Sequence, residues 1–188
     1  MKNIAIFASG EGTNAQNIID YFKNSQEAKV ELVLSNNAKA NVLKRASDAE
    51  IETIVIDKES FYENHTAINI LKSKSIDLIV LAGFLWKVPE NLVNTFPNKI
   101  INIHPALLPK FGGKGMYGLN VHKAVVEAQE SKTGISIHFV NSHYDEGAII
   151  AQHECTLEPN DSAEMVAQKV HELEQEFFPK EIEKVLKL

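Results

Sequence analysis

The amino-acid sequence predicts an α/β fold in which a mostly parallel central sheet carries helices on both faces. Short apolar runs alternate with longer amphipathic stretches through the first hundred residues, as in consecutive βαβ units. The 188 residues have the length of one domain, and no repeat, low-complexity segment or linker divides them. With 44% hydrophobic and 23% charged residues, the composition is that of an ordinary globular protein.

The expected strands are apolar runs of four to six residues, the length of buried strands in a parallel sheet. They cover residues 4–8, 30–34, 53–56, 76–81 and 99–103. The stretches between them have helical length or spacing and cover residues 14–23, 40–49, 61–72 and 89–95.

The second half of the sequence is less regular. Residues 110–119 hold four of the nine glycines, which indicates a mobile loop before a helix at 119–129. Alternating apolar and polar residues predict strands at 133–140 and 148–153, joined by a polar connection at 143–147. The last helix is expected to begin at Asp161, with Glu164 completing its cap, and to be kinked or interrupted at Pro179.

Charge and composition exclude several classes of protein. The formal net charge of −6 gives no global positive field for nucleic acid. No stretch approaches the roughly 20 apolar residues of a membrane helix. Cys155 is the only cysteine, so no intramolecular disulfide is possible, which is typical of a reducing compartment. We therefore expect a cytoplasmic protein that binds neither nucleic acid nor membrane.

A glycine-rich turn follows the first expected strand and precedes a helix. Gly10, Glu11, Gly12, Thr13 and Asn14 form this turn, where glycines and the free N–H groups of a helix start favour an anion. A single phosphate fits best. A dinucleotide site would need an acidic residue about 20 positions later, where Ser and Asn stand instead, although an NADP-type site and a plain turn stay open.

The most informative segment ends the fifth expected strand. Asn102 and His104 alternate with isoleucines there, so they point to the same face of the sheet, and Pro105 restricts the backbone of His104. Histidine carries protons near neutral pH, and an adjacent amide can stabilise an oxyanion. From these two residues alone, a structural pair and a catalytic pair are equally compatible. Asp145, in the polar connection, could orient the imidazole.

Together, these segments resemble the phosphoribosylglycinamide formyltransferase family. The matching stretches are residues 9–14, 81–84, 102–110 and 134–140, followed by 145–147, in the family's order and over nearly the whole chain. The resemblance implies a Rossmann-like formyltransferase fold in one domain, with a phosphate-binding part at 1–100 and a catalytic and folate-binding part at 101–188.

The resemblance also implies roles for individual residues. Asn102, His104 and Asp145 match the catalytic trio, residues 10–14 match the loop for the substrate phosphate, and Glu174 matches a carboxylate that holds the glycinamide end of the substrate. Without the resemblance, Glu174 is interpreted as a solvated helix charge. The implied contacts to the co-substrate 10-formyltetrahydrofolate are Leu85, Trp86, Lys87, Val88, Asn102, His143, Tyr144 and Asp145. Trp86 and Lys87 depart from the family, in which many members carry an arginine followed by apolar residues. The glycine-rich segment 111–118 is longer than in some members.

The expected reaction is direct attack of the substrate amine on the formyl carbon, with Asn102 and protonated His104 stabilising the oxyanion and Asp145 keeping His104 charged. No metal is expected, because the spacing of His138, His143 and His153 matches no compact ligand pattern. The remaining histidines, at 65, 122 and 171, are interpreted as ordinary helix residues.

A formyltetrahydrofolate hydrolase would carry a further N-terminal domain, and a methionyl-tRNA formyltransferase a C-terminal one, so both are disfavoured. A nonenzymatic binding module is the alternative of another class. The expected partners are small molecules, and the expected assembly is a monomer or weak homodimer.

Overall fold

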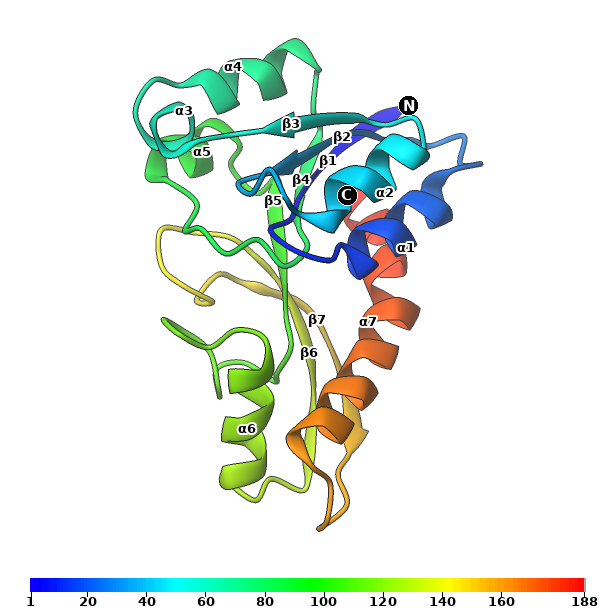
Figure 1. The fold of residues 1–188 in the computed structure, drawn as a ribbon, viewed down its shortest axis with the longest axis vertical. Helices are drawn as coiled ribbons and strands as arrows, with labels where there is room; N and C mark the ends of the chain where they lie inside the picture. The colour runs from blue at the N-terminus through cyan, green and yellow to red at the C-terminus, as the bar shows by residue number, and fades with distance from the viewer. Residues whose placement is uncertain (188) are drawn as a thin grey trace.

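The computed structural model, which describes residues 1–187, folds around one seven-stranded sheet (Figure 1). The strand order is β3-β2-β1-β4-β5-β6-β7, and the first five strands in that order run parallel. The last two strands pair antiparallel with their neighbours, β6 with β5 and β7 with β6. The strands are β1 (Lys2–Phe7), β2 (Ala28–Ser35), β3 (Glu52–Val55), β4 (Leu78–Leu81), β5 (Ile100–His104), β6 (Lys132–Phe139) and β7 (Ile149–Thr156).

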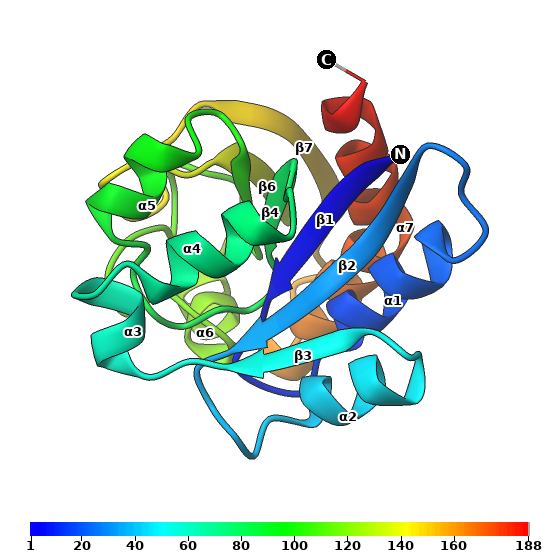
Figure 2. The same cartoon turned by 90° about the horizontal axis from the view of Figure 1, so that it is seen from above.

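Helices cover both faces of the parallel part of the sheet, as the alternation of elements predicts. Viewed from above, α3, α4 and α5 lie on one side, and α1, α2 and the long α7 lie on the other (Figure 2). The helices are α1 (Thr13–Phe22), α2 (Asn41–Asp48), α3 (Lys58–Tyr62), α4 (Thr66–Ser73), α5 (Glu90–Thr95), α6 (Leu119–Glu127) and α7 (Ala163–Leu186). No helix among residues 1–187 is long and apolar enough to cross a bilayer.

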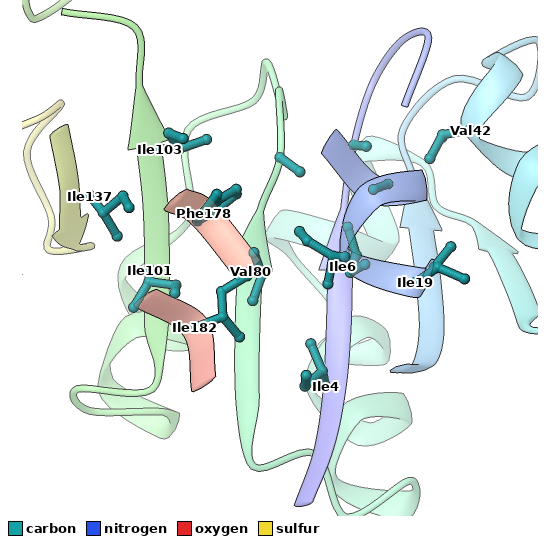
Figure 3. Close-up of a cluster of buried hydrophobic side chains, with 14 of the residues drawn as sticks. Ile4, Ile6, Ile19, Val42, Val80, Ile101, Ile103, Ile137, Phe178 and Ile182 are labelled. Atoms are coloured by element: carbon teal, nitrogen blue, oxygen red, sulfur yellow. The ribbon is translucent and has the colours of Figure 1, made fainter. Parts of the chain in front are cut away.

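Two apolar cores follow from this arrangement, one on each face of the sheet. Successive strand residues point to opposite faces, so Ile4 and Ile6 enter the core under α1 and α7, whereas Phe7 enters the other. Phe178 and Ile182 of α7 close the first core against β4 and β5 (Figure 3). Burying one such phenylalanine contributes about 1.5–3 kcal/mol.

Two helix predictions differ from the structure. The helix expected at 61–72 is two helices, because His65 adopts a left-handed backbone (φ 58°) that ends one segment and begins α4. The cap of α7 is Ser162, whose hydroxyl accepts from the N–H of Met165, while Asp161 instead accepts from the N–H of Glu158. Asp161 therefore closes the turn before the helix.

Pro179 does not interrupt α7, so of the predicted kink or interruption the second is wrong. The helix runs as one element from Ala163 to Leu186, with Pro179 buried inside it. A proline removes one backbone hydrogen bond and costs roughly 3 kcal/mol. Phe178 and Ile182, on either side of the proline, are fully buried against the sheet, and this burial of apolar surface offsets that cost.

The topology creates a site where the chain reverses its direction of winding. From β1 the chain proceeds outward to β2 and β3, then returns to the other side of β1 as β4 and β5. Loops leaving the carboxyl ends of β1 and β4 therefore diverge, and in open α/β sheets ligands bind in that crevice.

Candidate active site

One cleft of about 980 Å³ lies at this crevice. It takes residues from both parts of the chain, 1–100 and 101–188. Every site residue expected from the sequence lines it: Gly10, Glu11, Gly12, Thr13, Asn14, Leu85, Trp86, Lys87, Val88, Asn102, His104, His143, Tyr144, Asp145 and Glu174.

The glycine turn is held in place by α2. Val42 donates its N–H to the carbonyl of Gly10 at 3.1 Å, and Arg45 Nε donates to the carbonyl of Glu11 at 2.8 Å. Gly12 has φ 74°, and a Cβ there would lie 2.6 Å from the side chain of Val42. The carboxylate of Glu11 accepts from Asn41 Nδ2 and so is turned toward α2. The backbone N–H groups of this turn and of the first turn of α1 are available to donate hydrogen bonds to an anion.

Side chains from α7 complete this part of the cleft, which we call the glycine-loop end (residues 10–14, His171 and Glu174). Asn14 Nδ2 donates to Glu174 Oε2 at 2.9 Å, and Gln175 Nε2 donates to Asn14 Oδ1 at 2.9 Å. His171 Nδ1 lies 3.2 Å from the same Glu174 oxygen, and that hydrogen bond raises the pKa of His171. Asn14 and Glu174, 160 residues apart in sequence, are thus brought together.

The centre of the cleft is built on β5 and β6. Antiparallel pairing sets Asn102 opposite His138 and His104 opposite Ser136. His138 Nδ1 lies 2.8 Å from the carbonyl oxygen of Phe139, so this nitrogen carries the proton and donates. His138 Nε2 is then free to accept from Asn102 Nδ2 at 3.1 Å.

Asp145 lies between two imidazoles. Its Oδ2 is 3.6 Å from His104 Nδ1, and its Oδ1 is 3.6 Å from His138 Nε2. Both distances exceed those of direct hydrogen bonds, which leaves space for tightening when substrates bind. The N–H of Gly113 donates to Asp145 Oδ2 at 2.9 Å and fixes the carboxylate. The expected trio of Asn102, His104 and Asp145 is therefore assembled at one point.

The backbone of residue 111 orients His104. His104 Nε2 donates to the carbonyl of Phe111 at 2.8 Å. Phe111 has φ 56°, an unusual backbone for an aromatic residue. Because Nε2 carries the proton, Nδ1 presents its lone pair toward Asp145 and the cleft.

Burial changes the ionisation of this pair. Burial lowers the pKa of His104, and although the charge of Asp145 and the Phe111 carbonyl act in the opposite direction, they do not overcome it. Burial alone would raise the pKa of Asp145, but the adjacent imidazole of His138 and the hydrogen bond from the N–H of Gly113 outweigh it and lower that pKa. In the unliganded protein both shifts favour a neutral imidazole at His104 beside a charged carboxylate at Asp145.

Another part of the cleft is lined by Leu85, Trp86, Lys87, Val88 and Tyr144, and we call it, together with Tyr62 packed behind it, the aromatic end. The Trp86 ring packs against those of Phe61 and Tyr62, with centroids 5.7 and 5.8 Å away. The Tyr62 hydroxyl donates to the carbonyl of Lys87 at 3.0 Å, and Lys87 Nζ lies 5.6 Å from the ring centre of Tyr144. The N–H of Leu85 donates to the hydroxyl of Ser9, which joins this end to the glycine loop.

Three histidines of the site were not assigned there from the sequence. His122 and His171, interpreted as ordinary helix residues, line the cleft, and so does His138. The signal for His138 was present, since it alternates with buried isoleucines on a strand as Asn102 does. No comparable signal marks His122 or His171, because their places depend on how α6 and α7 pack. Within residues 1–187, no three His, Cys, Asp or Glu side chains are grouped to hold a metal ion.

Comparison with known proteins agrees with this geometry. A family model described as formyl transferase matches residues 2–182. The phosphoribosylglycinamide formyltransferase of Haemophilus influenzae is 40% identical over 95% of this chain and 84% of its own length. The chloroplastic enzyme of that name from Arabidopsis thaliana is 38% identical over 90% of this chain, which spans 60% of that protein.

Solved structures give the same result. Glycinamide ribonucleotide transformylase 1 from Geobacillus kaustophilus superposes with a TM-score of 0.89 at 32% identity, over 99% of each chain. Phosphoribosylglycinamide formyltransferase from Anaplasma phagocytophilum has a TM-score of 0.89 at 30% identity, over 99% of this chain and 87% of its own. Sequence, fold and cleft together place the chain in the formyl transferase family, among the phosphoribosylglycinamide formyltransferases.

Proposed function

We propose that this protein transfers the formyl group of 10-formyltetrahydrofolate to the glycinamide amine of 5′-phosphoribosylglycinamide, a step of purine biosynthesis, with Asn102, His104 and Asp145 at the reacting atoms. One observation carries the assignment of residues. The three side chains lie in one cleft between an anion-binding turn and an aromatic wall, as a phosphorylated acceptor and a reduced folate require.

The two ends of the cleft receive the two substrates. At the glycine-loop end, residues 10–14 offer backbone N–H groups to the phosphate, and Glu174 accepts from hydroxyl groups of the ribose. At the aromatic end, residues 85–88 with His143 and Tyr144 hold the flat pteridine, since apolar and aromatic surfaces bury such rings well. The exposed Lys87 lies where the anionic tail of the folate would leave the cleft.

His104 and Asp145 carry the proton between the two nitrogens. The amine attacks the formyl carbon, forming one C–N bond, and the proton it loses passes to the bare Nδ1 of His104. The resulting imidazolium faces the Asp145 carboxylate, whose charge favours it. When the bond between the formyl carbon and N10 breaks, His104 returns the proton to N10.

Asn102 stabilises the oxygen of the tetrahedral intermediate. One N–H of its amide donates to His138, which fixes the orientation of the amide and leaves the second N–H for the developing oxyanion. Losing one such donor costs roughly 10²–10³ in turnover in other enzymes.

Location and assembly belong to the same proposal. A cytoplasmic location and a monomer or weak homodimer are consistent with a single, partly buried thiol at Cys155, whose pKa is raised by burial. Sedimentation at several protein concentrations measures the assembly.

A spectrophotometric assay with both substrates tests the proposal, run on the wild type, on His104→Ala and without acceptor. We expect acceptor-dependent deformylation that falls by about 10²–10⁴ in the variant. His65→Asn is the matched control, because residue 65 lies away from the cleft and asparagine tolerates its left-handed backbone. Deformylation without acceptor would point to a hydrolase, and no turnover with both ligands bound would point to a binding module.

A further inference from the structure

His122 on α6 is a buried polar side chain that the reaction does not yet use. It is 6% exposed, it lines the cleft, and its Nδ1 has no hydrogen-bond partner among the described residues. Its neighbours Val121 and Val125 are fully buried and hold α6 in position. Buried polar groups in native proteins are nearly always hydrogen-bonded, so an unpartnered one at a ligand cleft requires a reason.

The surroundings of His122 connect the glycine-loop end with the reaction centre. His122, Glu174 and His104 all line the same cleft. Helices α6 and α7 pack against each other, and they carry His122 and Glu174 respectively. A molecule that lies in this cleft between the glycine loop and His104 can therefore meet the imidazole of His122.

The ring can offer one donor to such a molecule. Burial lowers the pKa of His122, so the imidazole is neutral at pH 7 and carries a single proton. A buried N–H without a hydrogen-bond partner is rarer in proteins than a buried acceptor without one. We therefore assign the proton of His122 to Nε2 and leave the buried Nδ1 as the unpaired acceptor. Among residues 1–187 no side-chain or backbone acceptor lies within hydrogen-bond reach of Nε2.

We propose that His122 Nε2 donates a hydrogen bond to the amide carbonyl of the acceptor's glycinamide arm. This bond would orient the arm and so place its amine at the reaction centre. This inference rests on the proposed function. Between its ribose and its amine, the acceptor carries one amide carbonyl, which needs a donor. Glu174 can only accept, and His104 and Asp145 are committed to the amine. His122 is a donor in this cleft whose N–H has no partner among the described residues, and it stands on a helix rather than on the glycine-rich loop.

Three substitutions at residue 122 separate its possible roles. His122→Phe keeps the ring and removes both nitrogens, His122→Gln places an amide N–H near the position of Nε2, and His122→Asn places one near Nδ1. We expect His122→Phe to raise the KM for the acceptor about tenfold or more, because the buried carbonyl loses its partner. His122→Gln should recover most of that loss and His122→Asn little. The KM for the co-substrate should not change.

A change in the acceptor provides an independent measurement. An acceptor analogue with a methylene in place of the amide carbonyl should bind the wild type more weakly than the natural acceptor does, by a factor similar to the His122→Phe effect. The same analogue and the natural acceptor should bind His122→Phe almost equally. Titration calorimetry without folate reads these affinities whether or not turnover occurs.

Several results would overturn the inference. The inference would be wrong if His122→Phe had the same KM for the acceptor as the wild type. It would also be wrong if His122→Asn restored that KM and His122→Gln did not. An equal rise of both KM values together with a lower urea midpoint would show a structural role instead. Absence of acceptor-dependent turnover in the wild type would instead contradict the proposed function, and the calorimetric comparison would still decide on His122.

Discussion

The two ends of the cleft are built by different physical means. At the glycine-loop end, polar groups bond to one another in series: Gln175 to Asn14, Asn14 to Glu174, and His171 to the same carboxylate. At the aromatic end the contacts are mostly ring against ring, and the hydrogen bond from Tyr62 to the Lys87 carbonyl fixes the chain. Ser9 joins the two ends through the N–H of Leu85.

This difference separates two forms of recognition. Hydrogen bonds are directional, so a network of them fixes positions to a fraction of an ångström and responds sharply to a displaced partner. Packing of rings is broad and tolerates small shifts. We therefore expect substitutions at the glycine-loop end to have steep effects on the acceptor, and those at the aromatic end to have graded effects on the folate.

Gly12→Ala tests the glycine-loop end, where we expect steep effects, and it should have the largest effect of all. The added Cβ would lie 2.6 Å from Val42 on a backbone with φ 74°, so the turn must move away from α2. We expect the KM for the acceptor to rise on the order of 100-fold, about 2.7 kcal/mol, from strain and displaced N–H groups. Steady-state kinetics with each substrate varied in turn measure this effect.

Gly10→Ala is the comparison variant, because nothing lies within 4 Å of its added Cβ, and it should change the same KM much less. Gly12→Ala combined with Val42→Ala removes only the contact with Val42 Cγ2, because the contacts with Val42 Cβ at 2.6 Å and Val42 Cα at 2.8 Å remain, so it should recover little of the loss. An unchanged acceptor KM in Gly12→Ala would contradict the view that this turn is rigid.

Trp86→Ala tests the aromatic end, where we expect graded effects on the folate. Removing the ring takes away its contacts with Phe61 and Tyr62 and loosens residues 85–88, so the KM for the folate should rise about tenfold with little change for the acceptor. Tyr62→Phe removes only the hydrogen bond to Lys87 and should raise the same KM about threefold. Effects on the acceptor as large as those on the folate would show that the two ends are not separable.

Two histidines that line the cleft on helices α6 and α7 titrate with opposite effects on stability, which gives the smallest expected effect. Burial lowers the pKa of His122, so below about pH 6.5 the unfolded chain binds a proton at this residue more readily than the folded chain does. The free energy of unfolding therefore decreases as the pH is lowered. The hydrogen bond to Glu174 raises the pKa of His171, so its contribution has the opposite sign and is lost as pH rises through the folded value. His122→Phe should flatten the loss of stability between about pH 7.5 and 5.5, by about 1 kcal/mol.

Urea unfolding at both pH values measures this difference. His171→Ala should steepen the loss, by less than the His122 effect because His171 is 44% exposed and solvent screens its pair with Glu174. Tyr62→Phe should leave the slope as in the wild type, since tyrosine does not titrate in this range. A steeper slope in His122→Phe would show that this imidazole is not kept neutral by burial.

The parallel half of the fold was predictable because its central strands are covered on both faces and so read as nearly continuous apolar runs. The four predicted βα units are present, and their ends differ by a few residues. The split at residues 63–65 was not predictable, because His65 in a left-handed backbone carries no sequence signal as a glycine would. The cap of α7 lay one residue from its expected position because Asp161 and Ser162 are both good caps.

The site divides in the same way. Asn102 and His104 were identifiable from polar alternation on a buried strand, and the resemblance supplied Asp145 and Glu174. The ionisation of His104 could not be read from the sequence, because its pKa depends on burial that only the packed structure reveals. His122 and His171 required the relative placement of α6 and α7, which no local pattern encodes.

One consequence follows from the backbone that joins the side chains of His104 and Asp145, which we propose as catalytic. Phe111 accepts from His104 and Gly113 donates to Asp145, and both belong to a glycine-rich segment that contributes to the cleft. If residues 111–113 swing outward, the imidazole and the carboxylate lose these hydrogen bonds in the same movement. In the proposed mechanism, the same movement would then open the cleft to water and release the proposed base, so that an open cleft holds no oriented base beside the formyl group.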